Sequence, residues 1–462
     1  MAATTKTKKP ARRNARPRAE PLDRLLRRRI DKKAARVGII GLGYVGLPLA
    51  CLFAEKGFSV TGFDVDPGKV DRLNAGRSYI KHIPSKRIST AVRDGRLVAS
   101  ADFRGLKRMD AILICVPTPL TKFREPDLQF VVATGEAIAR HLRAGQLVVL
   151  ESSTYPGTTT EVLKPILERG GFKSGRDFYL AYSPEREDPG NERFGTASIP
   201  KVVGGDGRAA LALAKALYDA AVVKTVPVSS PDTGEAIKLT ENIFRAVNIA
   251  MVNELKVIFD AMGIDVWEVI DAAKTKPFGF MPFYPGPGLG GHCIPIDPFY
   301  LTWKARAYGI NTRFIELAGE INTLMPRYVV NRLASALSNQ SGRALRRANI
   351  LLIGLAYKKN VDDMRESPAL VLIEMLEEAG AIVNYHDSFI TRIKPSRDHA
   401  ELAARRSVPL TPARLRKADA VLIVTDHDDV DYGLIARHAR LIVDTRNAMA
   451  KAGLHGPKIV KA

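Results

Sequence analysis

Residues 285–298 read PGPGLGGHCIPIDP and surround one thiol, Cys293, with backbone that carries almost no side chains. A cysteine thiolate is an intrinsically strong nucleophile where it is accessible and lies near positive charge. Glycines let a ligand approach the main chain closely, and the flanking prolines stiffen the loop. The same loop is also consistent with a rigid turn whose cysteine only fills space. The loop therefore predicts a candidate nucleophile that the rest of the chain must support.

A second group able to do chemistry lies in a run of helical periodicity from Gly234 to about Lys274, with a pause at Gly263. Lys238 and Asn242 are four residues apart, so they share one helix face. An ammonium and an amide on one face can stabilise a developing oxyanion. A solvated surface face is the alternative. The apolar content of this helix also predicts a dimer interface.

A nucleotide site near the N-terminus is the first element that must position these groups. A buried strand from Arg36 leads into Gly41, Gly43 and Gly46, which have the GxGxxG spacing. These glycines allow a tight turn, close approach by a pyrophosphate, and close packing of the helix on the strand. Asp64 ends the next predicted strand, where an acid binds the adenosine ribose and favours NAD over NADP. The predicted cofactor-binding set further includes Tyr44, Val45 and Lys69.

Strands predicted at residues 111–116, 147–150 and 179–183 continue this sheet. Ligands bind at the carboxyl ends of strands in an open parallel sheet. Thr118 and Thr154 follow the first two strands and are predicted to face the cofactor or the substrate, and Glu185 follows the third. Capping of turns is the alternative role for the two threonine hydroxyls.

A second strand-and-helix region begins near residue 344, with strands at 350–353, 382–385, 420–425 and 441–444 and a helix at 368–378. It predicts a second Rossmann-like domain that lacks a GxGxxG loop. A polar cluster just past its first strand contains Lys358, Lys359 and Arg365, which could hold phosphate or sugar groups. A solvated loop is the alternative for this cluster.

The length of 462 residues exceeds what one hydrophobic core accommodates. We predict an α/β protein with two Rossmann-like, doubly wound parallel-sheet domains joined by a central helical dimerisation domain. The expected parts are a basic tail with a short amphipathic helix at 1–34, the NAD-binding domain at 35–228, the helical domain with the cysteine loop at 229–335, and the second Rossmann-like domain at 336–462.

Composition excludes several classes. The three cysteines lie far apart without disulfide or metal-ligand spacing, which predicts a reducing cytoplasm and no metal site. No apolar run approaches the roughly 20 residues of a spanning helix, and the N-terminus lacks the apolar core of a signal peptide. The chain is therefore expected to stay in the cytoplasm.

The formal net charge of +21 is concentrated near the N-terminus, where residues 1–36 hold fourteen Lys and Arg against three acidic residues. Leu22, Leu25, Leu26 and Ile30 fall at helical spacing there. We expect a solvated tail and a docked helix, with weak contact to an anionic membrane or RNA as the alternative and no specific nucleic-acid binding. The remaining basic excess suits a polyanionic small molecule.

Four motifs resemble those of the UDP-glucose/GDP-mannose dehydrogenases, NAD-dependent enzymes that oxidise C6 of a nucleotide sugar from alcohol to carboxylate. They are GLGYVGLP from residue 41, EAIKLTEN from residue 235, GGHCIP from residue 290 and DDMRESP from residue 362. The resemblance covers roughly residues 36–447. It implies that the first domain binds NAD, that the central helices form a homodimer or higher homo-oligomer, and that the last domain binds the UDP of a UDP-sugar substrate.

The resemblance also implies roles for individual residues. Cys293 is the family's nucleophile, Lys238 and Asn242 are its oxyanion-side groups, Asp297 is the acidic partner four residues after Cys293, and water is handled by Glu185 and Thr154. The implied substrate-binding residues are Glu185, Lys238, Asn242, Gly290, Lys358, Lys359 and Arg365.

Residues of these types fit a four-electron oxidation. An aldehyde gives up hydride only after a nucleophile has added to it, so Cys293 forms a thiohemiacetal, and removal of the second hydride gives a thioester that water hydrolyses. Lys238 is expected to stabilise the developing alkoxide, and Asp297 or Glu185 to manage the proton and the water.

One departure from the glucose-directed members bears on the substrate. Those members usually carry a lysine just before the catalytic aspartate, where this chain has Ile296. The pattern resembles the branch acting on UDP-N-acetylhexosamines in bacterial surface polysaccharide synthesis, with UDP-N-acetylglucosamine expected first and UDP-N-acetylmannosamine second. A UDP-glucose 6-dehydrogenase is the alternative. A single-hydride Rossmann dehydrogenase and a non-enzymatic nucleotide-binding or RNA-binding protein are remote alternatives.

Overall fold

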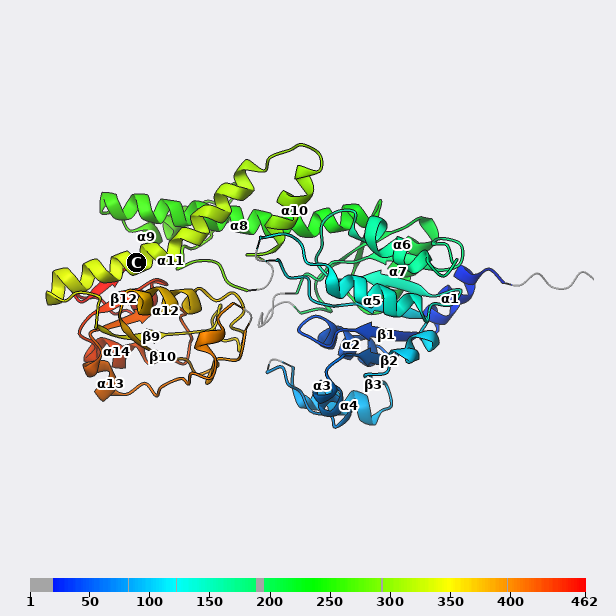
Figure 1. Ribbon diagram of the computed structural model, residues 1–462, viewed down its shortest axis with the longest axis horizontal. Coiled ribbons are helices and arrows are strands. Elements are labelled where there is room, and N and C mark those ends of the chain that lie inside the picture. The colour runs from blue at the N-terminus through cyan, green and yellow to red at the C-terminus, as the bar shows by residue number, and fades with distance from the viewer. Residues whose placement is uncertain (1–19, 82, 122, 188–194, 292–293, 397) are drawn as a thin grey trace, which may run out of the picture.

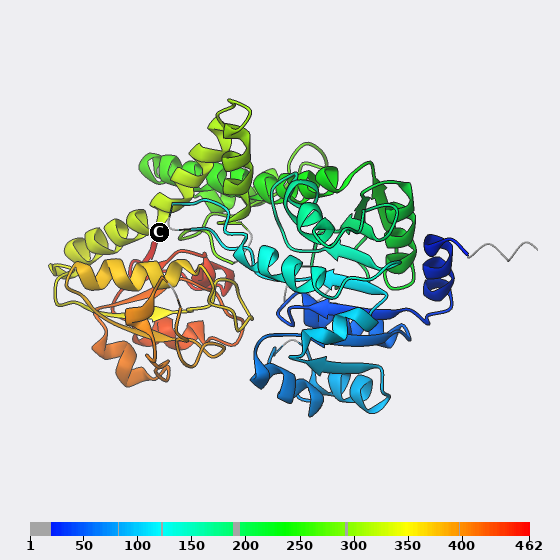
Figure 2. The same ribbon diagram turned by 45° about the vertical axis from the view of Figure 1, so that its right-hand side comes forward.

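The computed structural model describes residues 20–81, 83–121, 123–187, 195–291, 294–396 and 398–462. Two sheet domains lie side by side beneath a pair of long helices, α8 (Pro231–Met262) and α11 (Arg313–Ser341), which run across the top of Figure 1. The turned view in Figure 2 shows the same arrangement. The predicted fold class, two parallel-sheet domains joined by a helical region, is confirmed.

The first sheet has eight strands in the order β3-β2-β1-β4-β5-β6-β7-β8. Neighbouring strands are parallel except for β6 and β7, which are antiparallel. β4 and β5 are buried at every residue, because helices cover both faces of the sheet. The strands are β1 (Arg36–Ile40), β2 (Ser59–Phe63), β3 (Leu97–Ser100), β4 (Ala111–Ile114), β5 (Leu147–Leu150), β6 (Tyr179–Tyr182), β7 (Lys201–Gly205) and β8 (Thr225–Val228).

Helices follow most of these strands, as a doubly wound sheet requires. They are α2 (Gly46–Glu55), α3 (Pro67–Asn74), α4 (Ser85–Arg93), α5 (Gln129–Ala139), α6 (Lys164–Glu168) and α7 (Arg208–Asp219), with the short turns η1 (Phe103–Arg108) and η2 (Thr158–Leu163).

Capping residues set the two ends of α8. The Ser230 hydroxyl accepts the N–H of Thr233 and caps α8, and Pro231 occupies its first turn. Gly263 ends α8 in the left-handed conformation at φ 71°, and α9 (Val266–Ala273) follows. The pause predicted at Gly263 is therefore confirmed. α10 (Asp297–Arg306) then leads to α11.

The second sheet has five parallel strands in the order β10-β9-β11-β12-β13. The helix predicted at 368–378 is α12 (Pro368–Glu378), which is capped by the hydroxyl of Ser367. The strands are β9 (Asn349–Ile353), β10 (Ile382–His386), β11 (Ala420–Ile423), β12 (Ile442–Asp444) and β13 (Ile459–Lys461). The remaining elements are η3 (Ala400–Leu402), α13 (Pro412–Lys417), α14 (Tyr432–His438) and α15 (Ala448–Lys451).

The predicted amphipathic helix is α1 (Leu22–Asp31), and it packs on α7 at the far end of the first domain (Figure 1). Leu26 and Ile30 are fully buried there. Arg29 forms an ion pair with the buried Asp110 at 2.8 Å. The apolar side of α1 is thus occupied by its own domain, which leaves only polar side chains of this helix facing outward apart from the partly exposed Leu25.

Truncating the docked side of α1 should loosen the first domain. We expect Ile30→Ala to cost about 2–4 kcal/mol because it leaves a cavity in a well-packed contact. The measurement is the midpoint of thermal unfolding together with hydrogen exchange of the α1 and α7 amides. Leu25→Ala is the matched control on the same helix, since Leu25 is 38% exposed. Equal, small effects of both substitutions would contradict the docking.

Candidate active site

The turn between β1 and α2 has the geometry of a dinucleotide-binding loop. Gly41 adopts φ 90°, where other residues are strained, and a Cβ there would crowd the carbonyl of Cys115. A Cβ on Gly46 would collide with the carbonyl oxygen of Gly41, so strand and helix meet here at backbone distance. Gly43 has no heavy atom within 4 Å of its Cβ position. Open space lies where the pattern places a pyrophosphate.

Asp64 lies beside this loop, and its carboxylate is held in place. It accepts the Leu42 N–H at 2.9 Å and the Asp66 N–H at 3.0 Å, and it pairs with Lys69 at 3.1 Å. The Tyr79 hydroxyl donates to the Leu42 carbonyl and holds the loop from its other side. A buried carboxylate that can accept the ribose hydroxyls, next to an open glycine loop that can admit a pyrophosphate, is the combination that NAD requires, so these residues fit the cofactor.

The same loop reaches the C-terminal domain through Tyr44. The guanidinium of Arg365 lies over the Tyr44 ring, 4.7 Å from its centre. Burial, with Asp363 and Asp362 nearby, raises the pKa of Tyr44 to about 12. Val45, the other predicted loop residue, immediately precedes α2. The cofactor loop and the segment after β9 are therefore in direct contact.

Lys238, Asn242 and Asp297 come together although they lie on two helices. Lys238 and Asn242 are buried on α8, and Asp297 opens α10. The Asn242 amide donates to the Asp297 carboxylate at 2.6 Å. Burial raises the pKa of Asp297 to about 6, and the rise is opposed by the Lys238 ammonium and the Asn242 amide. The group combines a cation, an amide and an acid that titrates near neutrality.

Glu185 joins this group through its backbone. Its carbonyl oxygen accepts a hydrogen bond from the Lys238 ammonium at 2.6 Å. Its side chain turns toward β7, where the ammonium of Lys201 lies 3.2 Å from the carboxylate. Burial raises the pKa of Glu185, but Lys201 and two backbone N–H groups outweigh burial and lower it. Glu185 is thus an ionised carboxylate paired with Lys201, on a residue whose backbone carbonyl binds Lys238.

Thr154 is fully buried and lies beside a second carboxylate, Glu235. Glu235 accepts the N–H groups of Gly157 and Thr159 at 2.7 and 2.9 Å, and its oxygen is 3.4 Å from the Thr154 hydroxyl. Burial raises the pKa of Glu235 to about 7, and these hydrogen bonds restrain the rise. Glu235 fastens the first turns of α8 to the turn that carries Thr154.

The hydroxyl of Thr118 also forms a hydrogen bond within the protein. Its hydroxyl donates to the Ser153 carbonyl at 2.8 Å, and its own carbonyl accepts the Tyr300 hydroxyl. These bonds join the ends of β4 and β5 to α10.

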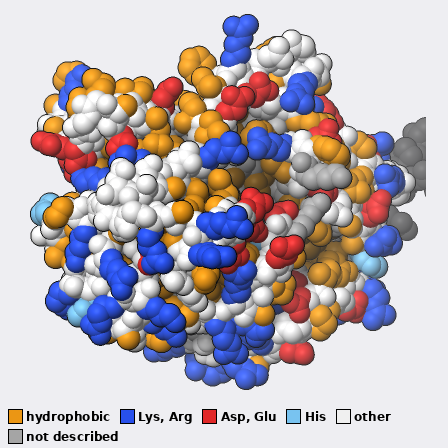
Figure 3. All heavy atoms as spheres, turned by 60° about the vertical axis from the view of Figure 1, so that its left-hand side comes forward, with side chains coloured by type: hydrophobic (Ala, Val, Ile, Leu, Met, Phe, Trp, Pro, Cys, Tyr) orange, Lys and Arg blue, Asp and Glu red, His pale blue; other side chains and the backbone are white. Residues whose placement is uncertain are grey.

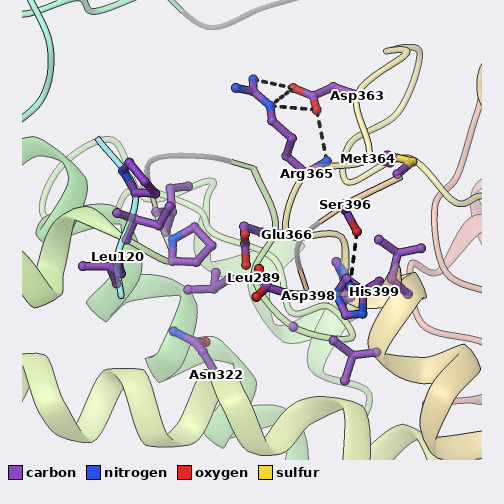
Figure 4. A pocket seen from close by; sticks show the side chains of 18 of the residues that line it. Leu120, Leu289, Asn322, Asp363, Met364, Arg365, Glu366, Ser396, Asp398 and His399 are labelled. Carbon is purple, nitrogen blue, oxygen red and sulfur yellow. Dashed lines mark hydrogen bonds and ion pairs between the residues drawn. The ribbon is translucent and has the colours of Figure 1, made fainter. Parts of the chain in front are cut away.

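A cavity of about 1000 Å³ lies where the three regions meet. Figure 3 shows hydrophobic, basic and acidic side chains together around a hollow near the middle of this face. In Figure 4, Leu120 and Leu289 lie on one side of the cavity, and Glu366, Asp398 and His399 lie across from them. The lining also includes Tyr44, Lys81, Arg124, Ile296, Phe299, Asn322 and Arg365.

The glycine-rich loop borders this cavity, but His292 and Cys293 lie outside the described residues. Gly290 leaves no room for a Cβ, which would lie 2.7 Å from the Tyr357 side chain. The N–H of Gly291 donates to the Arg365 carbonyl at 3.1 Å. The loop is therefore held against the C-terminal domain directly before Cys293.

The three basic residues predicted after β9 differ in their position relative to the cavity. Arg365 lines the cavity and pairs with Asp363 at 2.6 Å. Lys359 is half exposed and pairs with Asp428 at 3.0 Å. Neither Lys358 nor Lys359 belongs to the described lining of the cavity.

Sequence reasoning missed three charged residues that support this site: Glu151, Lys201 and Glu235. Glu235 is recognisable in retrospect because it lies one helical turn before Lys238. Glu151 ends a correctly predicted strand. Lys201, directly before the apolar run that starts at Val202, carried little signal, since its buried partners are distant in sequence.

None of the helices in the described part of the chain is long and apolar enough to cross a membrane. Within that same part, no three His, Cys, Asp or Glu side chains are grouped so as to hold a metal ion.

The two nucleotide-type sheets, with an open glycine loop beside a buried acid, define a dinucleotide-binding protein. The UDP-glucose/GDP-mannose dehydrogenase family matches the chain in three parts. Its NAD binding domain matches residues 35–222, its central domain 232–324 and its UDP binding domain 351–451. The chain belongs to this family and is an NAD-dependent nucleotide-sugar dehydrogenase that acts on a UDP-sugar.

The relatives of this chain are named for dehydrogenases of several different nucleotide sugars. The chain is 36% identical over 361 residues to the UDP-N-acetyl-D-glucosamine 6-dehydrogenase of Pseudomonas aeruginosa, covering 78% of this chain and 84% of the relative. It is 34% identical to the NDP-N-acetyl-D-galactosaminuronic acid dehydrogenase of Ralstonia nicotianae, covering 91% and 97%. The solved UDP-D-ManNAc dehydrogenase from Pyrococcus horikoshii superposes with a TM-score of 0.82 at 32% identity, covering 92% and 98%.

A methyl group added at two glycines of the cofactor loop should affect two different properties, NAD binding at one and stability at the other. Gly43→Ala should leave thermal stability unchanged and weaken NAD binding at least about tenfold, because the methyl enters the space meant for the pyrophosphate. Gly46→Ala should lower the unfolding temperature of the apoprotein, because its Cβ collides with backbone. Calorimetric unfolding and NAD titration separate the two effects. Undiminished NAD binding by Gly43→Ala would contradict this loop as the pyrophosphate site.

Proposed function

We propose that this enzyme oxidises C6 of a UDP-N-acetylhexosamine to the uronate, with two NAD reduced for each sugar, through covalent intermediates on Cys293. UDP-N-acetylglucosamine is the first choice of substrate and UDP-N-acetylmannosamine the second. The product would serve as a precursor of a bacterial surface polysaccharide.

One observation carries this proposal. Lys238, Asn242 and Asp297 converge in a buried group at the start of α10, four residues after Cys293 in the chain. A cation and an amide beside an acid that titrates near neutrality can stabilise an alkoxide and accept its proton. The cavity that borders this loop opens toward both nucleotide-type domains, as a substrate held between NAD and a UDP site requires.

Different sets of residues act in the two oxidation steps. Asp297 takes the proton of the C6 hydroxyl while the Lys238 ammonium stabilises the alkoxide, and loss of one hydride leaves the aldehyde. The Cys293 thiolate then adds to the aldehyde carbon, and Lys238 and Asn242 stabilise the oxyanion of the thiohemiacetal. Loss of a second hydride gives a thioester.

Hydrolysis releases the product. A water molecule attacks the thioester carbon, the carbon–sulfur bond breaks, and the thiolate returns to Cys293. Glu185, as an ionised carboxylate, accepts the proton of that water, and Thr154 lies on the adjacent turn. NAD supplies the hydride acceptor, and residues 41–46 with Asp64 would hold it.

The preference for an acetamido sugar rests on the relatives and on Ile296. The named relatives act on N-acetylhexosamine nucleotides of several configurations. Ile296 is buried in an apolar group with Tyr155, Leu239 and Tyr300, and it lines the cavity beside Asp297. A lysine at this position would bring a charge into that apolar group.

The direct test counts NADH formed per sugar consumed for UDP-N-acetylglucosamine, UDP-N-acetylmannosamine and UDP-glucose. We expect two NADH for each sugar, because an alcohol must lose two hydrides to become an acid. We also expect kcat/KM to be highest for an N-acetylhexosamine. Cys293→Ser should abolish uronate formation while it preserves NAD binding.

Each alternative predicts a different result. One NADH per sugar would favour a single-hydride dehydrogenase. A clear preference for UDP-glucose would favour a UDP-glucose 6-dehydrogenase. Full acid production by Cys293→Ser would remove the covalent step. Turnover that persists after deletion of residues 1–19 would argue against a role for the basic tail in the reaction.

We also propose a homodimer or higher homo-oligomer through the central helices. Phe244, Met251 and Ile258 are spaced by seven residues on α8 and form one exposed apolar stripe, which continues to Met262. A second copy of the chain that packs on this helix would bury the stripe in a homodimer interface.

Light scattering tests this assembly. Met251→Asp combined with Ile258→Asp should shift the protein toward a monomer, because two charges cannot be buried unpaired. Val223→Asp, at an exposed residue of the first domain, is the control and should leave the mass unchanged. A wild-type protein that is already monomeric at micromolar concentration would refute the proposed interface.

The cytoplasm is the proposed compartment, because the cysteine pattern is that of a protein in a reducing environment. Cys51 and Cys115 are both buried as free thiols. Recovery of the enzyme in the periplasmic fraction of cells would contradict this location.

A further inference from the structure

Lys201 is a buried lysine on β7 with no established role. Its side chain is 4% exposed, and its ammonium lies 2.6 Å from the carboxylate of Glu151 and 3.2 Å from that of Glu185. A third acceptor, the Pro184 carbonyl, is 3.3 Å away. A lysine is rarely buried unless it is paired, so these contacts account for its position.

Glu151 holds Lys201 from the end of β5. Its side chain is fully buried there, and its second oxygen accepts the Tyr218 hydroxyl. The Tyr218 ring lies 5.4 Å from the Lys201 ammonium. Neither Glu151 nor Glu185 belongs to the described lining of the cavity. One ammonium therefore serves two carboxylates, and Glu185 is the one whose backbone carbonyl binds Lys238.

Both carboxylate oxygens and the backbone carbonyl of Glu185 are held by hydrogen bonds. One carboxylate oxygen accepts the N–H groups of Arg186 and Glu187 at 2.7 and 2.6 Å, and the other faces Lys201. Its backbone carbonyl accepts the Lys238 ammonium at 2.6 Å. A continuous chain of contacts thus runs from Lys201 through Glu185 to Lys238.

We propose that Lys201 is a positioning residue of the oxidation, which keeps the Glu185 carboxylate ionised and oriented and, through the backbone of Glu185, keeps Lys238 aligned. The inference rests on the proposed function, in which Glu185 accepts the proton of the hydrolytic water.

The electrostatics of the group agree with this role. Burial raises the pKa of Glu185, and Lys201 is the largest influence that lowers it. Burial lowers the pKa of Lys201, but Glu151 and Glu185 outweigh burial and raise it, so the amine stays charged. Burial raises the pKa of Glu151, and Glu185 adds to the rise. Without Lys201, two buried carboxylates would repel each other, and protonation would relieve them.

Other groups around Glu185 are already engaged. Arg186 pairs with Glu241 of α8 at 2.6 Å, and Glu187 accepts the Thr196 hydroxyl at 2.6 Å. Burial holds the pKa of the Cys115 thiol well above its usual range, so the thiol is neutral. The titratable and charged groups that face Glu185 from neighbouring elements are Cys115, Glu151, Arg186, Glu187, Lys201 and Lys238.

The test is the pH profile of thioester hydrolysis, followed as uronate release in single turnovers of three variants, because Glu185 acts in this step whereas Asp297, whose pKa is raised to about 6, would set the acidic limb of overall kcat. Lys201→Met should move the acidic limb of the hydrolysis profile upward by about one to three pH units, because Glu185 loses its cation. Glu151→Gln should move the limb downward, because Lys201 then serves Glu185 alone. Lys201→Arg should restore a profile close to that of the wild type. NAD affinity should be unchanged in all three, since Lys201 is remote from the glycine loop in sequence and contacts.

A purely structural lysine would give another result. It would lower the rate of uronate release by one factor at every pH, with no shift of the limb and no opposite behaviour of Glu151→Gln, and that outcome would overturn the inference. If Lys201→Met does not fold, the double variant Lys201→Met with Glu151→Gln removes one of the two buried carboxylates that lose their cation, and it should still raise the limb.

Glu185→Gln separates this inference from the proposed function. Full turnover and an unchanged acidic limb in Glu185→Gln would refute the role of Glu185 and, with it, the role of Lys201. A loss of turnover in Glu185→Gln, combined with an unmoved limb in Lys201→Met, would refute the inference about Lys201 alone.

Discussion

The buried carboxylate of Glu235 is the constraint on which the rest of the site depends. It accepts two backbone N–H groups and a hydroxyl from the turn after β5, and it is completely removed from solvent. A helix of 32 residues could slide or rotate on an apolar surface, but a carboxylate with three donors permits one register. That register sets where Lys238 and Asn242, on the next two turns of α8, meet the end of the first sheet.

The buried polar and charged groups of the site have specific partners. Asn242 donates to Asp297, Lys201 is shared by Glu151 and Glu185, and Lys238 binds a carbonyl. In a low-dielectric interior such contacts are strong, and an orphaned member is costly. The same arrangement gives the carboxylates different acidities: the pKa of Asp297 rises because burial dominates, whereas the pKa of Glu185 falls because Lys201 and backbone donors dominate. Groups separated in this way are suited to different roles in proton transfer.

The two sheet domains also meet directly across the cavity. Arg365 lies over the Tyr44 ring of the cofactor loop, and Lys81 donates to the Phe389 carbonyl at 3.0 Å. The cysteine loop is held on the same side, because Gly290 packs on Tyr357 without room for a Cβ. Contacts between the cofactor loop, the cysteine loop and the C-terminal domain therefore bring three motifs of the chain to one cavity, although the first and the last, at residues 41–48 and 362–368, lie far apart in the sequence.

The sequence by itself determined the local features of this protein. The glycine spacing at 41–46, the acid at Asp64, the shared face of Lys238 and Asn242, and the break at Gly263 all follow from backbone geometry over a few residues. Only the tertiary structure decided the long-range pairs. Asn242 meets Asp297 across 55 residues, and Lys201 meets Glu151 across 50. No periodicity encodes such pairs, because their partners depend on strand order and on which charges the fold buries together.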